Sequence, residues 1–350
     1  MSHRLTVIAL FIAVASATPV PGFSPRDLVH DSTAIVVGKV EYLNSIATKG
    51  LFAGSAVPAK EYLARVNVDR VVKGGPDLLR TLNLHWIILL PSWGSVGYAS
   101  PPDGRYMMLF LKPDELPNTY TFASPYYPGV FASASDATSA QSETNAASEE
   151  QTYHKVLEEM GRFIDSPDEY GPERTRQLWQ LAFVNDPIVH EVAAMVVRDS
   201  NPDVRGQAMF TLLRLKDRAY LPMAREEILR DANGQGSDVH VGNLILAITE
   251  EFPASDSIDL LRTAAKSRNS ALLRTVAFAA RSTQSPLTIP ILLPLVDDPD
   301  DEVAWNAMHS LGELTKHLDW RPRSKEPEEW HRCLNLWHSF AASSAQASFP

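Results

Sequence analysis

The stretch at residues 288–314 reads TIPILLPLVDDPDDEVAWNAMHSLGEL, and its pattern decides the fold. An apolar segment containing Pro290 and Pro294 ends in an acidic turn at residues 297–301. A second apolar pattern follows at once, and its members recur at the spacing of one helix face: Val303, Ala307, Leu311 and Leu314. The stretch therefore predicts a helix, a tight polar turn and a second helix.

A similar phrase, DSNPDVRGQAMFTLLRL, occupies residues 199–215. The helices expected in this half are 172–183, 187–198, 202–216, 219–230, 238–250, 256–266, 270–282, 286–296, 301–316 and 327–342. Anchor residues of successive units are spaced by 37, 32 and 30 residues: Val204, Val241, Leu273 and Val303. A unit that recurs at this period predicts a stacked array of helix pairs, and such arrays typically serve as binding surfaces.

The units resemble the HEAT-repeat family, whose signature runs aspartate, proline, valine, arginine, alanine and leucine. The matching residues of the first unit are Asp199, Pro202, Val204, Arg205, Ala208 and Leu212. Residues 298–311 follow the same order, with Asp301 in the proline place and Ala304 in the arginine place, and residues 270–280 keep Leu273, Arg274 and Ala277. The resemblance covers residues 172–316. It implies an α-solenoid of about five helix pairs, in which Arg205 and Arg274 contact the acidic turn of a neighbouring unit.

The acidic run at residues 297–302 has two interpretations. A calcium loop of the EF-hand type needs acids at alternate positions, then Gly at position 6 and Glu at position 12, and that pattern is missing. Carboxylates also accept hydrogen bonds from the free N–H groups of a helix start. We therefore expect the run to cap the helix that follows it.

The first half of the chain is rich in β-strand patterns. A short helix is expected at residues 24–30, with Ser24 as its cap and Pro25 in its first turn. The expected strands are 34–40, 62–72, 82–90, 105–111 and one or two within 120–131. Short strands separated by Gly-, Pro- and Ser-rich connections predict a small antiparallel barrel or sandwich. The fold class expected for the chain is α+β in two domains.

Three of these segments carry a second family resemblance: AIVVGKV at residues 34–40, ARVNVDRVVKG at 64–74 and RYMMLFL at 105–111. They are similar to bacterial members of the netrin-like, metalloproteinase-inhibitor-like group of OB-fold barrels, over residues 24–131. The inhibitors of that group use an N-terminal cysteine and several disulfides, whereas Cys333 is the only cysteine of this chain. The resemblance therefore implies the barrel fold and not the inhibitory mechanism.

The N-terminus has the pattern of a secretory signal peptide. Arg4 precedes an apolar core at residues 5–14, and Ala15, Ser16 and Ala17 form a small-residue cleavage site. A buried N-terminal strand is the alternative. The expected domains are a signal peptide at 1–17 with cleavage after Ala17, a β-barrel at 18–131, a flexible linker at 132–150 and the helical array at 151–350. A helix at residues 149–164 either closes the barrel or leads into the array.

Composition restricts the partners. The chain has 350 residues, of which 21% are charged, and its net charge is −10. Nucleic-acid binding is disfavoured because the sequence has no run of basic residues. After the expected signal peptide there is no run of about 20 apolar residues, so no membrane span is expected in the mature chain. The partner expected is an unidentified protein.

Candidate sites for chemistry are few. His309, His317, His331 and His338 gather near the C-terminus, but zinc requires three or four converging ligands and no H-E-x-x-H motif is present. Cys333 is expected to be a small buried apolar residue. Residues 233–236 form a glycine-rich loop without a preceding strand. The last expected helix carries Trp330, Trp337 and Phe340, which form either a cap over the open end of the array or an aromatic ligand platform.

These observations favour an exported protein-interaction or scaffolding protein that uses the solenoid surface, located outside the cell or in the periplasm. We expect no enzyme activity and no cofactor, and we assign no catalytic, cofactor-binding or metal-binding residue. Two alternatives stay open: a protease-directed binding or inhibitory module in the barrel, and a metal-dependent hydrolase that uses the C-terminal histidines.

Overall fold

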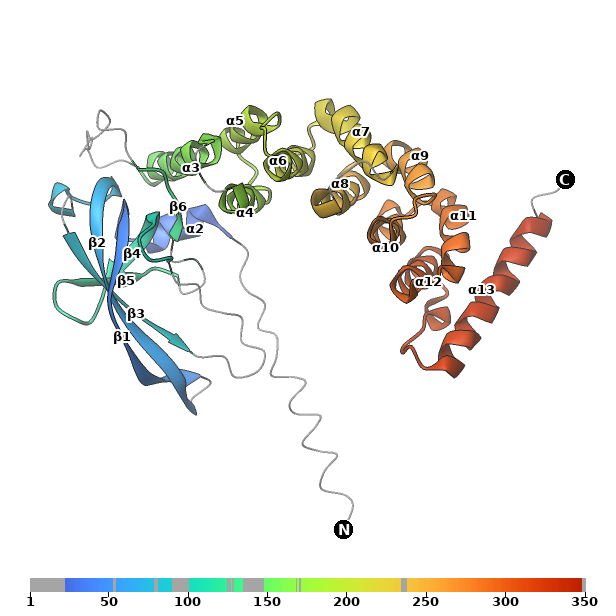
Figure 1. Ribbon diagram of the computed structural model, residues 1–350, viewed down its shortest axis with the longest axis horizontal. Coiled ribbons are helices and arrows are strands. Elements are labelled where there is room, and N and C mark those ends of the chain that lie inside the picture. The colour runs from blue at the N-terminus through green and yellow to red at the C-terminus, as the bar shows by residue number, and fades with distance from the viewer. Residues whose placement is uncertain are drawn as a thin grey trace, which may run out of the picture. The chain divides into compact units, whose positions relative to one another are not determined.

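The computed structural model describes residues 23–52, 55–78, 81–89, 101–124, 127, 129–134, 148–167, 169, 171–233 and 238–347. The expected signal peptide, most of the expected linker and the loop at residues 234–236 lie outside them. The chain divides into two units, one holding residues 1–180 and 186–192, the other holding 181–185 and 193–350. A β-sheet forms the first part of the chain and packed helices follow (Figure 1). The expected order, a β-barrel and then an all-α region, is confirmed.

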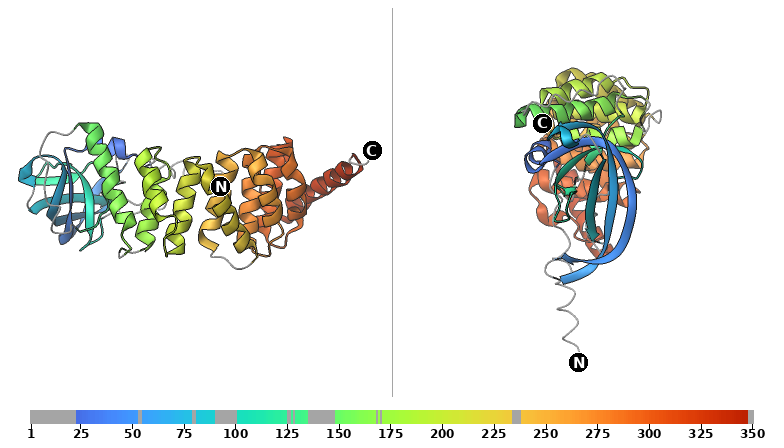
Figure 2. Two further views of the ribbon diagram at one scale, coloured as in Figure 1. Left: turned by 90° about the horizontal axis from the view of Figure 1, so that it is seen from above. Right: turned by 90° about the vertical axis from the view of Figure 1, so that its left-hand side faces the viewer.

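The strands of the sheet are β1 (Ala34–Phe52), β2 (Ser55–Lys73), β3 (Thr81–Leu89), β4 (Tyr106–Pro113), β5 (Thr119–Phe122) and β6 (Gly129–Phe131). They lie in the order β1-β2-β3-β5-β4-β6, and β1 also pairs with β4. The sheet therefore closes almost into a ring, whose curvature is visible in Figure 2. One pairing differs from the expected antiparallel barrel, because β3 and β5 run parallel and make the sheet mixed.

Strands β1 and β2 are much longer than the sequence predicted. Each spans 19 residues, and together they form one ribbon that continues to the pair Phe52 and Ser55. The sequence pattern marked only the parts that border the barrel. Residues 44–49, in the outer part of the ribbon, are largely exposed. Because neither face is buried there, the sequence shows no alternation of apolar and polar residues from which a strand could be predicted.

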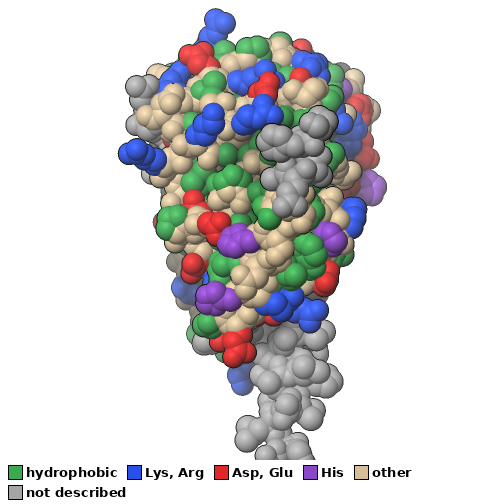
Figure 3. Space-filling view, turned by 90° about the vertical axis from the view of Figure 1, so that its right-hand side faces the viewer, with side chains coloured by type: hydrophobic (Ala, Val, Ile, Leu, Met, Phe, Trp, Pro, Cys, Tyr) green, Lys and Arg blue, Asp and Glu red, His purple; other side chains and the backbone are tan. Residues whose placement is uncertain are grey.

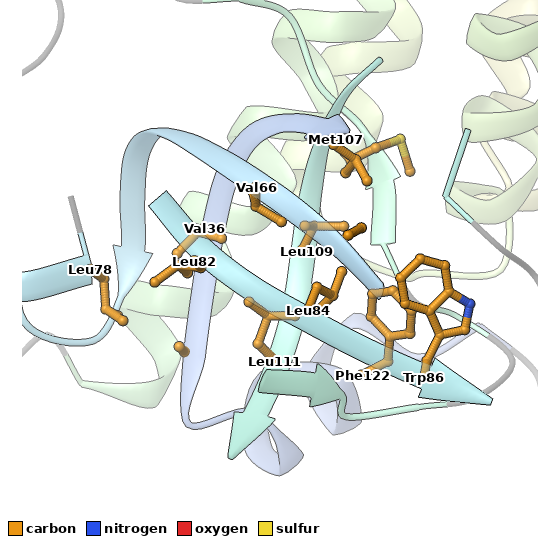
Figure 4. Close-up of a cluster of buried hydrophobic side chains, with 13 residues drawn as sticks. Val36, Val66, Leu78, Leu82, Leu84, Trp86, Met107, Leu109, Leu111 and Phe122 are labelled. Carbon is orange, nitrogen blue, oxygen red and sulfur yellow. The ribbon is translucent and has the colours of Figure 1, made fainter. Parts of the chain in front are cut away.

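Apolar side chains from β1 to β5 meet inside the curved sheet (Figure 4). The labelled members of this core are Val36, Val66, Leu78, Leu82, Leu84, Trp86, Met107, Leu109, Leu111 and Phe122. At one side of the core the ring of Trp86 stacks on Tyr62, with 5.1 Å between the ring centroids. This burial supplies the main driving force for closing the sheet.

The parallel seam of the ring is short. Backbone pairing between β3 and β5 joins Asn83 to Thr119 and Leu84 to Tyr120. Beside the seam, His85 of β3 bridges β2 to the turn after β4, since its Nε2 lies 3.0 Å from Glu61 and its Nδ1 lies 2.9 Å from Asp114. Burial opposes ionisation of Asp114. Hydrogen bonds from the Leu116 amide and from His85 outweigh it, so the pKa of Asp114 is below its ordinary value.

Helices α2 (Pro25–Asp31), α3 (Glu149–Asp165) and α4 (Gly171–Leu181) accompany the sheet. Ser24 caps α2, as the sequence predicted. Glu159 of α3 binds Arg70 of β2, with 3.0 Å between Arg70 Nε and Glu159 Oε1. On α4, Gln177 donates to the carbonyl oxygen of Phe131 at the end of β6. The helix expected at 149–164 contacts the barrel through Glu159 and also packs on α4, where Arg174 donates to the carbonyl oxygen of Ile164.

The remaining helices are α5 (Pro187–Val196), α6 (Pro202–Arg214), α7 (Leu221–Ala232), α8 (Asp238–Glu251), α9 (Ala254–Ala264), α10 (Ser270–Ala279), α11 (Ile289–Leu292), α12 (Asp301–Thr315) and α13 (Pro327–Ala347). They form two layers. Helices α6, α8, α10 and α12 pack in sequence against one another, and α7 packs against α9 in the other layer (Figures 1 and 2).

One expected helix is broken. Residues 286–296 form a short 3-10 turn, the single helical turn α11 and a second 3-10 turn that ends at Asp297. Pro290 and Pro294 lack the N–H group that an α-helix needs, and their rings clash with the preceding turn. The segment nevertheless packs against α12, so it keeps its place in the array.

We expect Asp114→Asn to lower the free energy of unfolding of the first unit at pH 7 by about 1 kcal/mol, a value reduced because the pair is partly hydrated. A carboxyl group whose folded pKa is depressed stabilises the fold above its unfolded pKa, near 3.9 for Asp, and this stabilisation is lost as the pH falls through the folded pKa. The difference between wild type and variant should therefore shrink at pH 3. Urea unfolding at both pH values measures it. Glu115→Gln, which changes the neighbouring exposed carboxylate, is the control, and an equal loss in this variant would contradict the assignment.

Candidate functional site

The acidic turn before α12 joins two helices of the array. The side chain of Asp300 accepts hydrogen bonds from the amides of Glu302, at 2.9 Å, and Val303, at 3.4 Å, and so caps α12. The same carboxylate binds Arg274 of α10, with 2.5 Å from Arg274 Nη2 to Asp300 Oδ2. The hydrogen bond with Arg274 holds the pKa of Asp300 below its ordinary value. The cap prediction and the predicted role of Arg274 are both confirmed.

Arg205 does not follow the same pattern. Its Nη1 donates to the carbonyl oxygens of Asp199, at 2.8 Å, and Ser200, at 2.9 Å, both in the turn before its own helix. The prediction that Arg205 contacts the acidic turn of a neighbouring unit is therefore wrong. Residues 233–237, which follow α7 and precede α8, include no acidic residue, so that segment offers no carboxylate to an arginine.

The four C-terminal histidines do not form a metal site. Each has a separate neighbour: the Pro322 carbonyl for His309, the Pro327 carbonyl for His331, the Asp297 carboxylate for His338 and the Trp320 ring for His317. On the face of the molecule drawn in Figure 3, the histidine side chains in view lie apart from one another. Among the described residues, no group of three or more His, Cys, Asp and Glu side chains is arranged to hold a metal ion.

Helix α13 covers the end of the array. Trp337 and Cys333 are fully buried, and the ring of Trp320 meets Trp337 edge to face at 5.1 Å. Burial raises the pKa of the Cys333 thiol. Trp330, on the same helix, stacks on Trp305 of α12 with 6.3 Å between the ring centroids. The aromatic side chains of α13 therefore act as the cap that was one of the two expectations, and Cys333 is the buried apolar residue that was expected.

A different set of side chains stays accessible along the layer of α6, α8, α10 and α12. Phe183, which precedes α5, is 54% exposed and Phe278 of α10 is 37% exposed. Arg214 lies over the ring of Phe183, with its guanidinium carbon 5.5 Å from the ring centroid, and Arg281 lies 3.7 Å from the centroid of Phe278. A guanidinium over an aromatic face is attracted by the ring quadrupole.

Each of these arginines also reaches a carboxylate on the next helix of the layer. Arg214 Nη1 lies 2.6 Å from Glu250 of α8, and Arg281 Nη1 lies 3.6 Å from Glu313 of α12. Between them, α8 and α10 approach closely enough that a Cβ on Gly242 would lie 3.1 Å from Thr275 Oγ1. We name this set the arginine–phenylalanine row: Phe183, Arg214, Glu250, Phe278, Arg281 and Glu313.

The row has the composition of a protein-binding surface. Exposed rings held beneath planar guanidinium groups give a rigid, partly apolar surface, and aromatic and arginine side chains dominate the binding energy of many protein interfaces. Sequence reasoning missed the row, because the arginines stand 67 positions apart in the sequence and align only after the helices have stacked. The signal available in the sequence was an aromatic residue within a helical segment, such as Phe278. The sequence does not distinguish such a residue from one in the buried core.

Comparisons with known proteins add no family to this description. A scan against models of protein families finds no match to this chain, and a search of curated proteins finds none either. Within the described residues, every helix is too short or too polar to cross a lipid bilayer.

We expect Asp300→Ala to lower the melting temperature of the helical unit, because the change removes both the α12 cap and the partner of Arg274. Asp300→Asn should lower it less, since asparagine also caps helices well but carries no charge. Asp301→Ala, which alters the neighbouring exposed carboxylate, serves as the control. Thermal unfolding followed by circular dichroism should rank the losses in that order. An equal effect of Asp301→Ala would contradict the role of Asp300 as both the α12 cap and the partner of Arg274.

We expect Cys333 to react with a thiol reagent about tenfold or more slowly in the folded protein than in urea, since burial keeps it protonated and inaccessible. Leu287→Cys adds a thiol at a position that is 62% exposed, and this thiol should react in the folded state. Mass spectrometry of the labelled peptides measures both rates. Rapid labelling of Cys333 without denaturant would show that α13 does not cap the array.

Proposed function

We propose that this protein is an exported protein-interaction or scaffolding protein whose helical array binds another protein through the arginine–phenylalanine row. The observation that carries the proposal is the exposure of Phe183 and Phe278 beneath Arg214 and Arg281. Leaving two aromatic rings partly in water forgoes burial that would stabilise the fold, and a partner that covers them recovers it.

The array supports the proposal through its architecture. Layered helices that pack mainly on their neighbours, joined by the Asp300–Arg274 contact, fit a HEAT-like solenoid. The ring formed by β1 to β5 fits an OB-type, netrin-like barrel. A fold is a weak guide to function, so the surface residues and not the fold carry the argument. Export rests on the sequence pattern at residues 1–17 alone.

The two alternative functions draw less support. A protease-directed role for the barrel lacks the N-terminal cysteine used by inhibitors of the netrin-like group. A metal-dependent hydrolase lacks converging ligands, because the partners of His309, His331 and His338 lie in three separate places.

We expect the double variant Phe278→Ala with Arg281→Ala to weaken binding of the partner by about tenfold or more, the loss typical of a hot-spot pair. Cross-linking in the native host, followed by purification and mass spectrometry, identifies the partner, and a binding titration measures the loss. Leu287→Ala removes an exposed apolar side chain outside the row and should bind like wild type.

Two outcomes would overturn the proposal. One is that folded wild-type protein captures no partner above background. The other is that the double variant binds the captured partner as tightly as the Leu287→Ala control does.

A further inference from the structure

Among the described residues, one side of β1 has no paired strand beyond its first part. Pairing with β4 covers residues 34–39 of β1, and pairing with β3 covers residues 59–67 of β2. The amide of Tyr42 still donates to Asp103. Beyond it, β1 pairs only with β2 among the described residues, and the ribbon reaches past the other strands in Figure 1 and in the right-hand view of Figure 2.

The open side of β1 is regular over nine residues. A bulge places Leu43 outside the ladder, and from Asn44 to Phe52 the register with β2 is unbroken. We call residues 44–52 the β1 edge. Ile46, within the edge, is 51% exposed, and Leu43, directly before it, is 54% exposed. An extended, exposed edge with apolar side chains is a template for pairing with another strand.

Protection of the ribbon is one-sided. In the part of the chain that the structure describes, the segment of β2 without a β3 partner is the short one at residues 55–58. It includes Pro58, and proline has no N–H group to give to a ladder. The β1 edge contains no proline. It carries one charged residue, Lys49, and the whole segment at residues 42–59 carries no other. Charged residues make up 21% of the chain, so this segment is unusually neutral.

We propose that the β1 edge pairs with the β1 edge of a second copy of this chain, antiparallel about a two-fold axis. The net charge of −10 makes two copies repel each other, and the neutral ribbon is where they approach at least electrostatic cost. The contact occupies the β1 edge of each copy, and Pro58 hinders strand pairing on the β2 side of the ribbon. The pairing therefore closes as a dimer instead of growing into a fibre.

The two-fold axis passes midway between Thr48 of one copy and Thr48 of the other, and Thr48 is the midpoint of the β1 edge. This register pairs all nine residues and places Thr48 opposite its own copy, and threonine pairs are favourable across strands. It also places Lys49 opposite Ala47 of the second copy, so the two lysines are not directly opposed. The proposal is independent of the arginine–phenylalanine row, which lies in the helical unit.

The experiment measures the mass of the full chain by light scattering over a concentration series. Wild type should become dimeric as the concentration rises, and Ile46→Lys should stay monomeric because it replaces an exposed apolar side chain of the edge with a charge that pairing would have to desolvate. Leu287→Lys places the same charge on an exposed site of the helical unit and should dimerise like wild type. Phe278→Ala should also dimerise, which separates this result from the proposed function.

A second readout does not depend on weakening the contact. Under mild oxidation, Thr48→Cys should form a disulfide-linked dimer, because directly opposed residues bring their Cβ atoms within about 5.5 Å. Cys333 is buried and stays reduced, and Leu287→Cys serves as the control that should not cross-link.

Three outcomes would overturn the proposal. The first is that wild type stays monomeric at all concentrations and Thr48→Cys does not cross-link. A dimer that Ile46→Lys leaves intact would place the contact elsewhere. A monomeric wild type whose captured partner protein is lost in Ile46→Lys would assign the edge to a different chain.

Discussion

The helices of the second part of the chain depend on one constraint, which is that a helix with an apolar face is stable only when a neighbour covers that face. Asp300 shows how closely this packing is tied to local structure. One carboxylate accepts the free amides at the start of α12 and binds Arg274 on α10. Ser310 adds a second link, donating to the Ala277 carbonyl oxygen at 2.6 Å. The same carboxylate therefore caps one helix and binds the neighbouring helix, so the acidic turn has a structural role.

Stacking also determines what the array can present to a partner. Because α6 packs on α8 and α10 packs on α12, Arg214 meets Glu250 and Arg281 meets Glu313. These contacts hold each guanidinium in place over a phenylalanine ring. The rings of Phe183 and Phe278 then remain partly exposed in fixed orientations, which favours binding because little side-chain freedom is lost when a partner docks.

The sheet must also cover its apolar face, and it does so mainly with its own strands. Its apolar face is covered by closing the sheet on itself, and closure depends on the short parallel seam between β3 and β5 with His85 beside it. Closure removes free edges only where strands meet. Within the described residues, the β1–β2 ribbon extends beyond the ring, and its β1 edge has no second strand beside it; this is the edge for which we propose strand pairing.

Local features were determined by the sequence itself. The caps Ser24 and Asp300, the barrel-bordering strands and the expected helices other than the broken one at 286–296 follow from side-chain chemistry and periodicity within a few residues. Tertiary structure alone decided the parallel seam, the length of the ribbon and the alignment of Arg214 with Glu250. The seam and the alignment join residues that are far apart in the chain, and the outer part of the ribbon is largely exposed to solvent. Periodicity records which face of an element is buried, and it carries no information about which distant element covers that face.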